Sequence, residues 1–509
     1  MLPRCWAPLH LLSAQDAEPA AAAKPAPAAA PKPVPAADPA TVAADSPAKE
    51  AVDAFNKGRA IEAVRMAKPL ADGGNGDALL LMGVAHQYGQ GADVDPDKAV
   101  DFYRRARKAG NSESAYRLAR ILIEQGKDDT RKEARELLEE LAKSDTGAAS
   151  RILGEGALRG WFGGEADFEK TKFWWEKAAG AGDVAAILAL GQLYDGNFGF
   201  PDKRDPKAAL DQFVKAAKLN NAAAMVAVGS RLLNGDEKIR DEKTGREWLD
   251  KAFKEGQFDA CLALGDFEEA VKKDDAKAFT HYKTGAEGGQ TGCMLKLAQF
   301  ITAGRGGQEK SEDEALKWLK KAGEGNNPLG NFQAAAILLK RDKPQELLDG
   351  YKYLVAAAEA GLADVQNELG LLFLSAKLGV RDGSAAAGWF SRSAAAGFAP
   401  AANNLAALYE EGVGLPRNLD QARRLYLQAA NAGHPQATTA LGRFYARSIA
   451  TKPDLAKAWA LFSLAVERGD NDAKALLGDL TSQLTEEQMN EGRKLLEELK
   501  KPDSKGIQE

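Results

Sequence analysis

The stretch "LYEEGVGLPRNLDQARRLYLQAANAGHPQA", residues 408–437, contains the pattern from which most of the chain is built. An apolar-periodic run ends in a Gly-rich turn, and a second periodic run begins after Asn418 and ends at Gly433. Asn accepts the free N–H groups of a first helical turn, and Gly adopts the left-handed conformation that ends a helix. The stretch therefore predicts a two-helix unit, with helix A before the Gly-rich turn and helix B after it.

The unit repeats along the chain. The segments "AAEAGLADVQNELG", "SAAAGFAPAANNLA", "AANAGHPQATTALG" and "AVERGDNDAKALLG" align without gaps, and their glycines at 361, 397, 433 and 469 stand 36 residues apart. A small residue, usually Gly, lies nine residues after each of these anchor glycines, in the middle of helix A. Because Gly in a helix interior costs about 1 kcal/mol, its recurrence predicts that a second helix approaches the backbone closely there.

Helix B carries a recurring pair of bulky residues. The pairs include Phe102-Tyr103, Trp174-Trp175, Trp248-Leu249, His281-Tyr282, Trp318-Leu319, Trp389-Phe390, Leu425-Tyr426 and Leu461-Phe462. One hairpin cannot bury these faces alone, but stacked neighbours can. The sequence therefore predicts an all-α fold, a right-handed α-solenoid of about twelve two-helix repeats of about 36 residues, with an elongated, curved shape.

Composition excludes several classes of function. The chain has 509 residues, of which 45% are hydrophobic and 28% charged, and its net charge is −5. Nucleic-acid binding needs a basic face, so we expect no nucleic-acid partner. No apolar run approaches the roughly 20 residues that span a bilayer, so we expect no transmembrane segment. The four histidines and three cysteines are scattered, so we expect no metal site and no cofactor.

The chain divides into four predicted regions. We interpret residues 1–16 either as the remnant of a secretory signal or as a tail without function, because a basic residue precedes a short, interrupted apolar run. Residues 17–48 are Ala- and Pro-rich and are typical of a disordered linker. The repeat solenoid is expected over residues 49–483. Residues 484–509 should form a C-terminal capping helix and tail, which begins with a Thr/Glu capping pattern.

The repeat resembles the Sel-one-like repeat family, a close relative of the tetratricopeptide repeats. The resemblance extends over about residues 50–500, although residues 128–147, 234–257 and 326–345 lack its G-x-G-V turn. One unit matches the family pattern at Ala401, Leu405, Tyr409, Gly412, Val413, Gly414, Ala422, Tyr426, Ala429, Ala430 and Gly433. The resemblance implies an adaptor or scaffold that holds a partner protein or peptide on the solenoid surface, and it names no partner.

Enzyme-like motifs are present but badly placed. "SPAK" (Ser46 to Lys49) has the S-x-x-K spacing of penicillin-recognising enzymes, and "KTG" begins at Lys243 and again at Lys283. That chemistry needs KTG on a strand, whereas both triplets lie in predicted B helices. Cys261 and Cys293 occupy Ala-type positions in helix A of consecutive units. We interpret them as small buried residues, and a disulfide between them stays open.

The surface of the A helices is the remaining candidate site. In tetratricopeptide solenoids these helices line the concave groove, and by resemblance the best-formed units should place there Asn367, Asn403, Glu410, Arg443 and Arg447. Asn both donates and accepts, so it can pair with the backbone of an extended peptide. The alternative is that these residues are solvated, or that Asn403 and Asn404 brace the neighbouring repeat.

These observations favour a non-enzymatic scaffold that is exported from a bacterial cell, to the periplasm or beyond. A cytoplasmic location is the alternative. The competing function is a cell-envelope enzyme or enzyme inhibitor, for example one that acts on peptidoglycan. The oligomeric state does not follow from the sequence.

Overall fold

A computed structural model describes residues 46–144, 147–341, 343–377, 379–447, 449, 453–501 and 506–507. The regions predicted at 1–16 and over most of 17–48 lie outside these residues. All regular elements in the described part of the chain are helices, and no strand occurs there. The chain forms an all-α solenoid of tandem two-helix repeats, as the periodicity predicts.

The described residues form two compact units, which meet at the junction of Lys272 and Lys273. The N-terminal unit contains α1 (Lys49–Asn56), α2 (Ala60–Asp72), α3 (Gly76–Tyr88), α4 (Pro96–Lys108), α5 (Ser112–Gln125), α6 (Asp128–Ser144), α7 (Gly147–Arg159), α8 (Phe168–Gly180), α9 (Val184–Tyr194), η1 (Pro201–Lys203), α10 (Pro206–Lys218), α11 (Ala222–Asn234), η2 (Glu237–Ile239), α12 (Glu242–Lys254), α13 (Asp259–Phe267) and the π-helix η3 (Glu268–Lys272).

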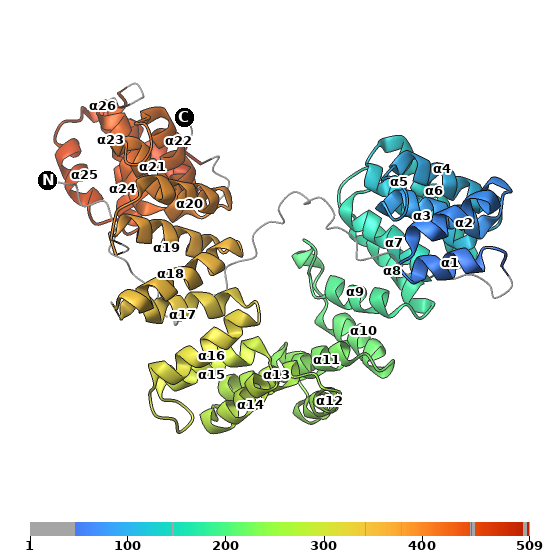
Figure 1. The fold of residues 1–509 in the computed structure, drawn as a ribbon. Helices are drawn as coiled ribbons and strands as arrows, with labels where there is room; N and C mark the ends of the chain where they lie inside the picture. The colour runs from blue at the N-terminus through green and yellow to red at the C-terminus, as the bar shows by residue number, and fades with distance from the viewer. Residues whose placement is uncertain are drawn as a thin grey trace. The chain divides into compact units, whose positions relative to one another are not determined.

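The C-terminal unit contains α14 (Asp275–Glu287), α15 (Thr291–Ala303), α16 (Glu312–Glu324), α17 (Pro328–Lys340), α18 (Pro344–Glu359), α19 (Ala363–Leu374), α20 (Gly383–Ala395), α21 (Ala399–Glu411), α22 (Leu419–Asn431), α23 (Pro435–Ala446), α24 (Leu455–Glu467), α25 (Ala473–Thr481) and α26 (Glu486–Leu499). From α15 onward the odd-numbered helices are A helices and the even-numbered ones are B helices. Figure 1 shows the successive helices of this unit side by side, and from α14 to α25 each packs on the next.

The anchor residues end the B helices as predicted. The anchor glycines have φ between +81° and +96°, the left-handed region that favours glycine: Gly74, Gly110, Gly182, Gly256, Gly361, Gly397, Gly433 and Gly469. In two units the anchor is Asn220 or Asn326, each with φ of 60°. Asn tolerates this conformation better than other non-glycine residues, which explains how the repeat continues where the glycine is missing.

The small residue in the middle of helix A receives an aromatic ring from helix B. A Cβ at Gly370 would lie 2.5 Å from Cε1 of Phe390, and a Cβ at Gly442 would lie 2.6 Å from Cε1 of Phe462. The predicted close approach is therefore confirmed. The ring of the second member of the bulky pair fills this space.

The two members of a bulky pair differ in burial in several repeats, although Leu461 and Phe462 are both buried. Phe390 is fully buried, whereas Trp389 is half-buried and lies under the guanidinium of Arg392 at 4.6 Å. Trp174 is likewise half-buried, while Trp175 is buried. The packing between helices thus depends mainly on the second residue of the pair, and the first covers the edge of the core.

The helix α26 begins with a capping box. Thr485 accepts a hydrogen bond from the backbone N–H of Gln488, and the Gln488 side chain accepts one from the Thr485 N–H. The partner is thus a Gln, and not the Glu that we read from the sequence. The reciprocal bond needs a side chain at the third helical position, which is Gln488. The helix packs against α24.

Candidate partner-binding face

Three successive A helices of the C-terminal unit, α19, α21 and α23, carry the five residues predicted to face a partner. We call these five the A-helix face: Asn367, Asn403, Glu410, Arg443 and Arg447. Asn403 and Glu410 are seven residues apart on α21, and Arg443 and Arg447 lie four apart at the end of α23. These spacings place each pair on one side of its helix.

Asn367 connects two repeats. It is 5% exposed, and its Oδ1 accepts a hydrogen bond of 2.9 Å from Nδ2 of Asn404 on the next A helix. A buried amide that is bonded across two helices fixes their register. The bracing that the sequence suggested for Asn404 is thus present, and its partner is Asn367.

Glu410 is bonded within its own repeat. Its Oε2 accepts a hydrogen bond of 2.8 Å from the hydroxyl of Tyr426 on α22, and its backbone carbonyl accepts one from Nε of Arg417 at 2.9 Å. The same contact recurs in the N-terminal unit, where Oε1 of Gln87 accepts a bond of 2.6 Å from the hydroxyl of Tyr103. A carboxylate or amide at this position satisfies the buried tyrosine of helix B.

The other three side chains face solvent without an internal partner. Asn403 and Arg443 are half-buried and Arg447 is exposed. In the part of the chain that the structure describes, none of the three makes a side-chain hydrogen bond or ion pair. Their donors and acceptors are therefore available to a ligand.

Glu368 was missed by the sequence reasoning. It is 9% exposed, and its Oε2 has no hydrogen-bond partner. Burial, with a smaller contribution from the charge of Asp364, raises the pKa of Glu368 to about 7. The sequence offered no clear signal: the same position, seven residues after the anchor, holds Leu81, Ala189 and Ala440 in some repeats but Arg117 and Asn404 in others.

The chain's repeats match those of known proteins. Ten segments match the Sel1 repeat: residues 76–111, 112–145, 148–183, 184–221, 222–257, 258–290, 292–327, 363–398, 399–434 and 435–470. These segments cover more than half of the chain. It belongs to the Sel1 repeat family. Sel1 repeat proteins are generally protein-interaction scaffolds, and they typically lack enzymatic activity.

Individual relatives share part of the Sel1 repeat array. The chain is 26% identical over 276 residues to the chitin synthase regulator SKT5 of Saccharomyces cerevisiae, which is 51% of this chain and 39% of that protein. The chain thus spans about two-fifths of the length of this relative. It is 28% identical over 168 residues to the Sel1-repeat-containing protein YjcO of Escherichia coli, which is 31% of this chain and 72% of YjcO.

A solved structure with the same repeat also matches. The protein c5321, a protective antigen of uropathogenic Escherichia coli that displays an SLR fold, is 23% identical with a TM-score of 0.46. The match covers 85% of this chain and 93% of that one.

The enzyme-like motifs are not arranged as that chemistry requires. The two KTG triplets fall inside α12 and α14, so neither is on a strand. Ser46 lies just before α1, where its hydroxyl donates a 2.5 Å hydrogen bond to Asp77 and accepts one from the N–H of Ala48. The described residues contain no group of three His, Cys, Asp or Glu that could hold a metal ion. Nor does any helix among them have the length and apolarity to cross a membrane.

Three further residues, Cys261, Cys293 and His434, have structural rather than chemical roles. Cys261 and Cys293 are both buried and form no disulfide, and burial raises the pKa of the Cys261 thiol. His434 precedes α23, and its Nδ1 accepts a hydrogen bond of 3.3 Å from the N–H of Ala437. The imidazole therefore caps this helix.

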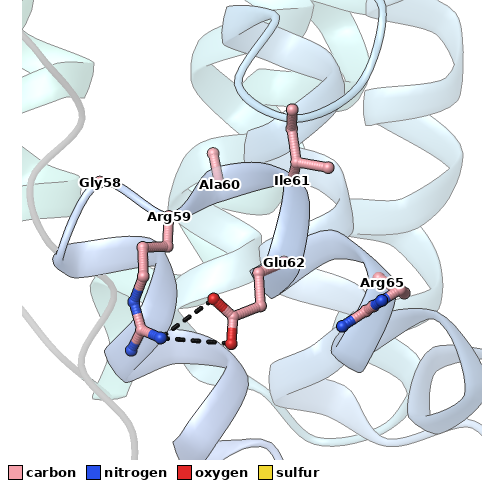
Figure 2. Close-up of a pocket in the computed structure, with 6 residues that line it drawn as sticks. All are labelled: Gly58, Arg59, Ala60, Ile61, Glu62 and Arg65. Atoms are coloured by element: carbon pink, nitrogen blue, oxygen red, sulfur yellow. Dashed lines mark hydrogen bonds and ion pairs between the residues drawn. The ribbon is translucent and has the colours of Figure 1, made fainter.

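Two shallow pockets lie away from the A-helix face. Figure 2 shows the first, of about 450 Å³, at the start of α2, where Arg59 and Glu62 form an exposed ion pair of 3.0 Å. The second, of about 550 Å³, lies on α16, α17 and α18, and in it Lys352 pairs with Asp349 at 3.5 Å. Exposed pairs of this kind contribute little, and neither pocket has the apolar lining that is usual for a small-molecule site.

Proposed function

We propose that this Sel1 repeat protein is a non-enzymatic scaffold that binds an extended segment of a partner protein on the A-helix face of α19, α21 and α23. The observation that carries the proposal is the set of unpartnered polar side chains Asn403, Arg443 and Arg447 on two successive A helices. A repeat array offers such a surface because equivalent positions of neighbouring helices lie side by side.

The chemistry of the face indicates what the partner presents. The Asn403 amide can donate to and accept from an extended backbone. Arg443 and Arg447 provide planar donors that match carboxylates. We therefore expect an extended peptide segment with at least one acidic side chain.

We place this scaffold in the bacterial cell envelope, exported to the periplasm or secreted. The proposal is supported by the Ala- and Pro-rich composition of residues 17–44, which follows a short apolar run. Fractionation of native cells tests it, because an envelope protein should be recovered outside the cytoplasmic fraction. Recovery with cytoplasmic markers would contradict this location and leave the binding proposal intact.

The partner is to be captured from native cells with the full chain and identified by mass spectrometry. Binding of the purified partner is then compared between the native chain and the triple variant Asn403→Ala, Arg443→Ala, Arg447→Ala. Each exposed contact contributes about 0–1 kcal/mol, so the three together should weaken binding by about tenfold or more. Circular dichroism melts check that the variant stays folded.

A charge-matched control uses Arg381→Ala and Arg424→Ala. Both arginines are exposed, and Arg424 lies on the B helix α22. The control also removes two positive charges, but outside the A-helix face, and it should bind the partner like the native chain. Equal affinity of the triple variant, or an equal loss in the control, would refute the A-helix face as the binding surface.

A further inference from the structure

A short segment near the end of the sequence lies against the last turn of α22. The backbone N–H of Ile507 donates a hydrogen bond of 2.7 Å to Oδ1 of Asn431, and Nδ2 of Asn431 donates one of 3.1 Å to the carbonyl of Ile507. One amide side chain thus satisfies both backbone groups of a single residue. This arrangement recognises the backbone of one residue through its N–H and its carbonyl.

The side chain of Ile507 supplies the apolar part of the contact. It is 4% exposed and belongs to the hydrophobic core of α20 to α25. Among the described residues, it is the one buried member of that core that lies outside a helix. The core therefore has a socket on its surface that accepts an aliphatic side chain from a separate segment.

The residue before Ile507 is selected by its lack of a side chain. Gly506 has φ of 73°, and a Cβ built on it would lie 2.8 Å from Oδ1 of Asn431. Any other residue there would meet both backbone strain and a clash with the amide. The site therefore selects a segment in which a Gly is followed by an aliphatic residue.

The contact between Asn431 and the Gly506–Ile507 segment is open to displacement. Asn431 stays exposed, so water competes for its two hydrogen bonds. The segment is separated from Asn431 by 76 residues of sequence, and two hydrogen bonds to the Asn431 side chain and the burial of Ile507 help to hold it. A core strand or helix would instead be held by a ladder of backbone bonds.

We propose that Asn431 and the socket filled by Ile507 form a peptide-binding site, which the chain's own Gly506–Ile507 occupies and which a partner's Gly–aliphatic segment takes when it displaces them. The site lies at the end of a B helix, apart from the A-helix face, so this proposal does not rest on the proposed function. The chain's own segment acts as a tethered competitor.

The strength of this competition can be estimated. A segment tethered by a short linker has an effective concentration of about 1 mM. A free peptide with an intrinsic dissociation constant of about 100 μM would therefore bind the native chain about tenfold more weakly than a chain whose own segment is expelled. Partners must then bind tightly, or make further contacts, to open the site.

The test uses a fluorescent peptide, KPDSKGIQE, with the sequence of residues 501–509. Its binding to the full native chain is compared by anisotropy with its binding to the full chain that carries Ile507→Asp, in which a charge expels the tethered segment. We expect about tenfold tighter binding to the variant. Adding Asn431→Ala to the variant should abolish binding, whereas adding Arg424→Ala on the same helix should not.

Peptide variants test the selectivity. Peptides with Gly506→Ala or Ile507→Asp should not bind the expelled chain, and a scrambled peptide should not either. Equal binding of the Gly506→Ala peptide, or no binding of any peptide to a folded Ile507→Asp chain, would overturn the proposal. Variants of the A-helix face should leave this binding unchanged, so failure here is distinguishable from failure of the proposed function.

A second measurement covers the case in which Ile507→Asp unfolds the unit. Hydrogen exchange of the native chain is followed with and without an excess of acetylated peptide, which differs in mass from the chain's own fragment. The peptide should speed exchange of the Ile507 amide and leave the amides of α22 protected. Unchanged exchange of the Ile507 amide would show that the peptide does not displace the segment, and it would refute the proposed peptide-binding site.

Discussion

The close packing of helix A against the ring from helix B can be tested by adding a single methyl group. In Gly370→Ala, the new Cβ would lie 2.5 Å from Cε1 and 2.7 Å from Cδ1 of Phe390, whose side chain is fully buried. Ala favours a helix over Gly by about 1 kcal/mol. Overpacking of a core costs about 1–3 kcal/mol, and the ring has no exposed side toward which to move. We therefore expect a cost in the upper half of this range and, once the helix gain is subtracted, a net loss of about 1–2 kcal/mol.

The chain provides a matched control at the same repeat position. Gly478 on α25 is exposed, and no described atom outside its own helix lies within 4 Å of a Cβ built there. In Gly478→Ala only the helix preference should act, so stability should rise by up to about 1 kcal/mol. The same substitution at equivalent repeat positions should thus change the free energy of unfolding in opposite directions.

The two variants are compared with the native chain by urea unfolding followed by circular dichroism. The double variant Gly370→Ala, Phe390→Leu should lose less than the sum of its single changes, because a smaller side chain leaves room for the methyl group. The reasoning is refuted if Gly370→Ala is as stable as the native chain, or if Gly478→Ala is destabilised equally.

Other contacts give predictions of the same kind. Glu268 is 2% exposed, and its Oε1 lies 2.5 Å from Nη2 of Arg246. Arg246→Ala should therefore destabilise the N-terminal unit by about 2–3 kcal/mol, as measured by urea unfolding. This loss is smaller than that for a fully buried pair because the arginine is partly exposed. The pKa of Glu368 is raised from 4.5 to about 7, so its ionisation lowers stability progressively between pH 4.5 and 7, and the loss is complete above pH 7. Glu368→Gln should therefore stabilise the chain by about 1–3 kcal/mol at pH 8, with the gain shrinking as the pH falls toward 4.5 in melts across this range.

Both of these changes have internal controls. Adding Glu268→Gln to Arg246→Ala should restore part of the loss, since it removes the stranded charge; an unimproved double variant would mean that Arg246 acts through packing alone. The exposed Glu359→Gln should leave stability unchanged at every pH. A gain for Glu368→Gln that does not vary with pH would contradict the raised pKa.

Much of the fold follows from local sequence because each repeat contacts mainly its neighbours. The periodicity predicts that a second helix approaches Gly370 closely, and the structure shows that the ring of Phe390 makes this contact. The division after Lys272 was less visible. The anchors Gly256 and Gly289 stand only 33 residues apart (289 − 256), and α13 has nine residues before it passes into the π-helix η3. A shortened unit signals irregular packing, but not where the compact units divide.

The candidate site could be predicted only in part. Helical spacing places Asn403, Arg443 and Arg447 on a common side of their helices, and the structure leaves them without internal partners. Spacing cannot show that Asn367 bonds to a neighbouring repeat, because this depends on side-chain rotamers across two helices. Nor can it show the pairing of Asn431 with a residue 76 positions away. Contacts across that distance depend on tertiary structure, which a repeat pattern does not encode.

The A-helix face is tested most directly by site-specific photo-crosslinking in native cells. A photo-crosslinking phenylalanine analogue is placed at Asn403 on α21 or, as the control, at the exposed Arg424 on α22. If the face binds a partner protein, the analogue at position 403 should yield a discrete crosslinked species that is absent when it stands at position 424. Crosslinking from position 424 with none from position 403 would contradict the account.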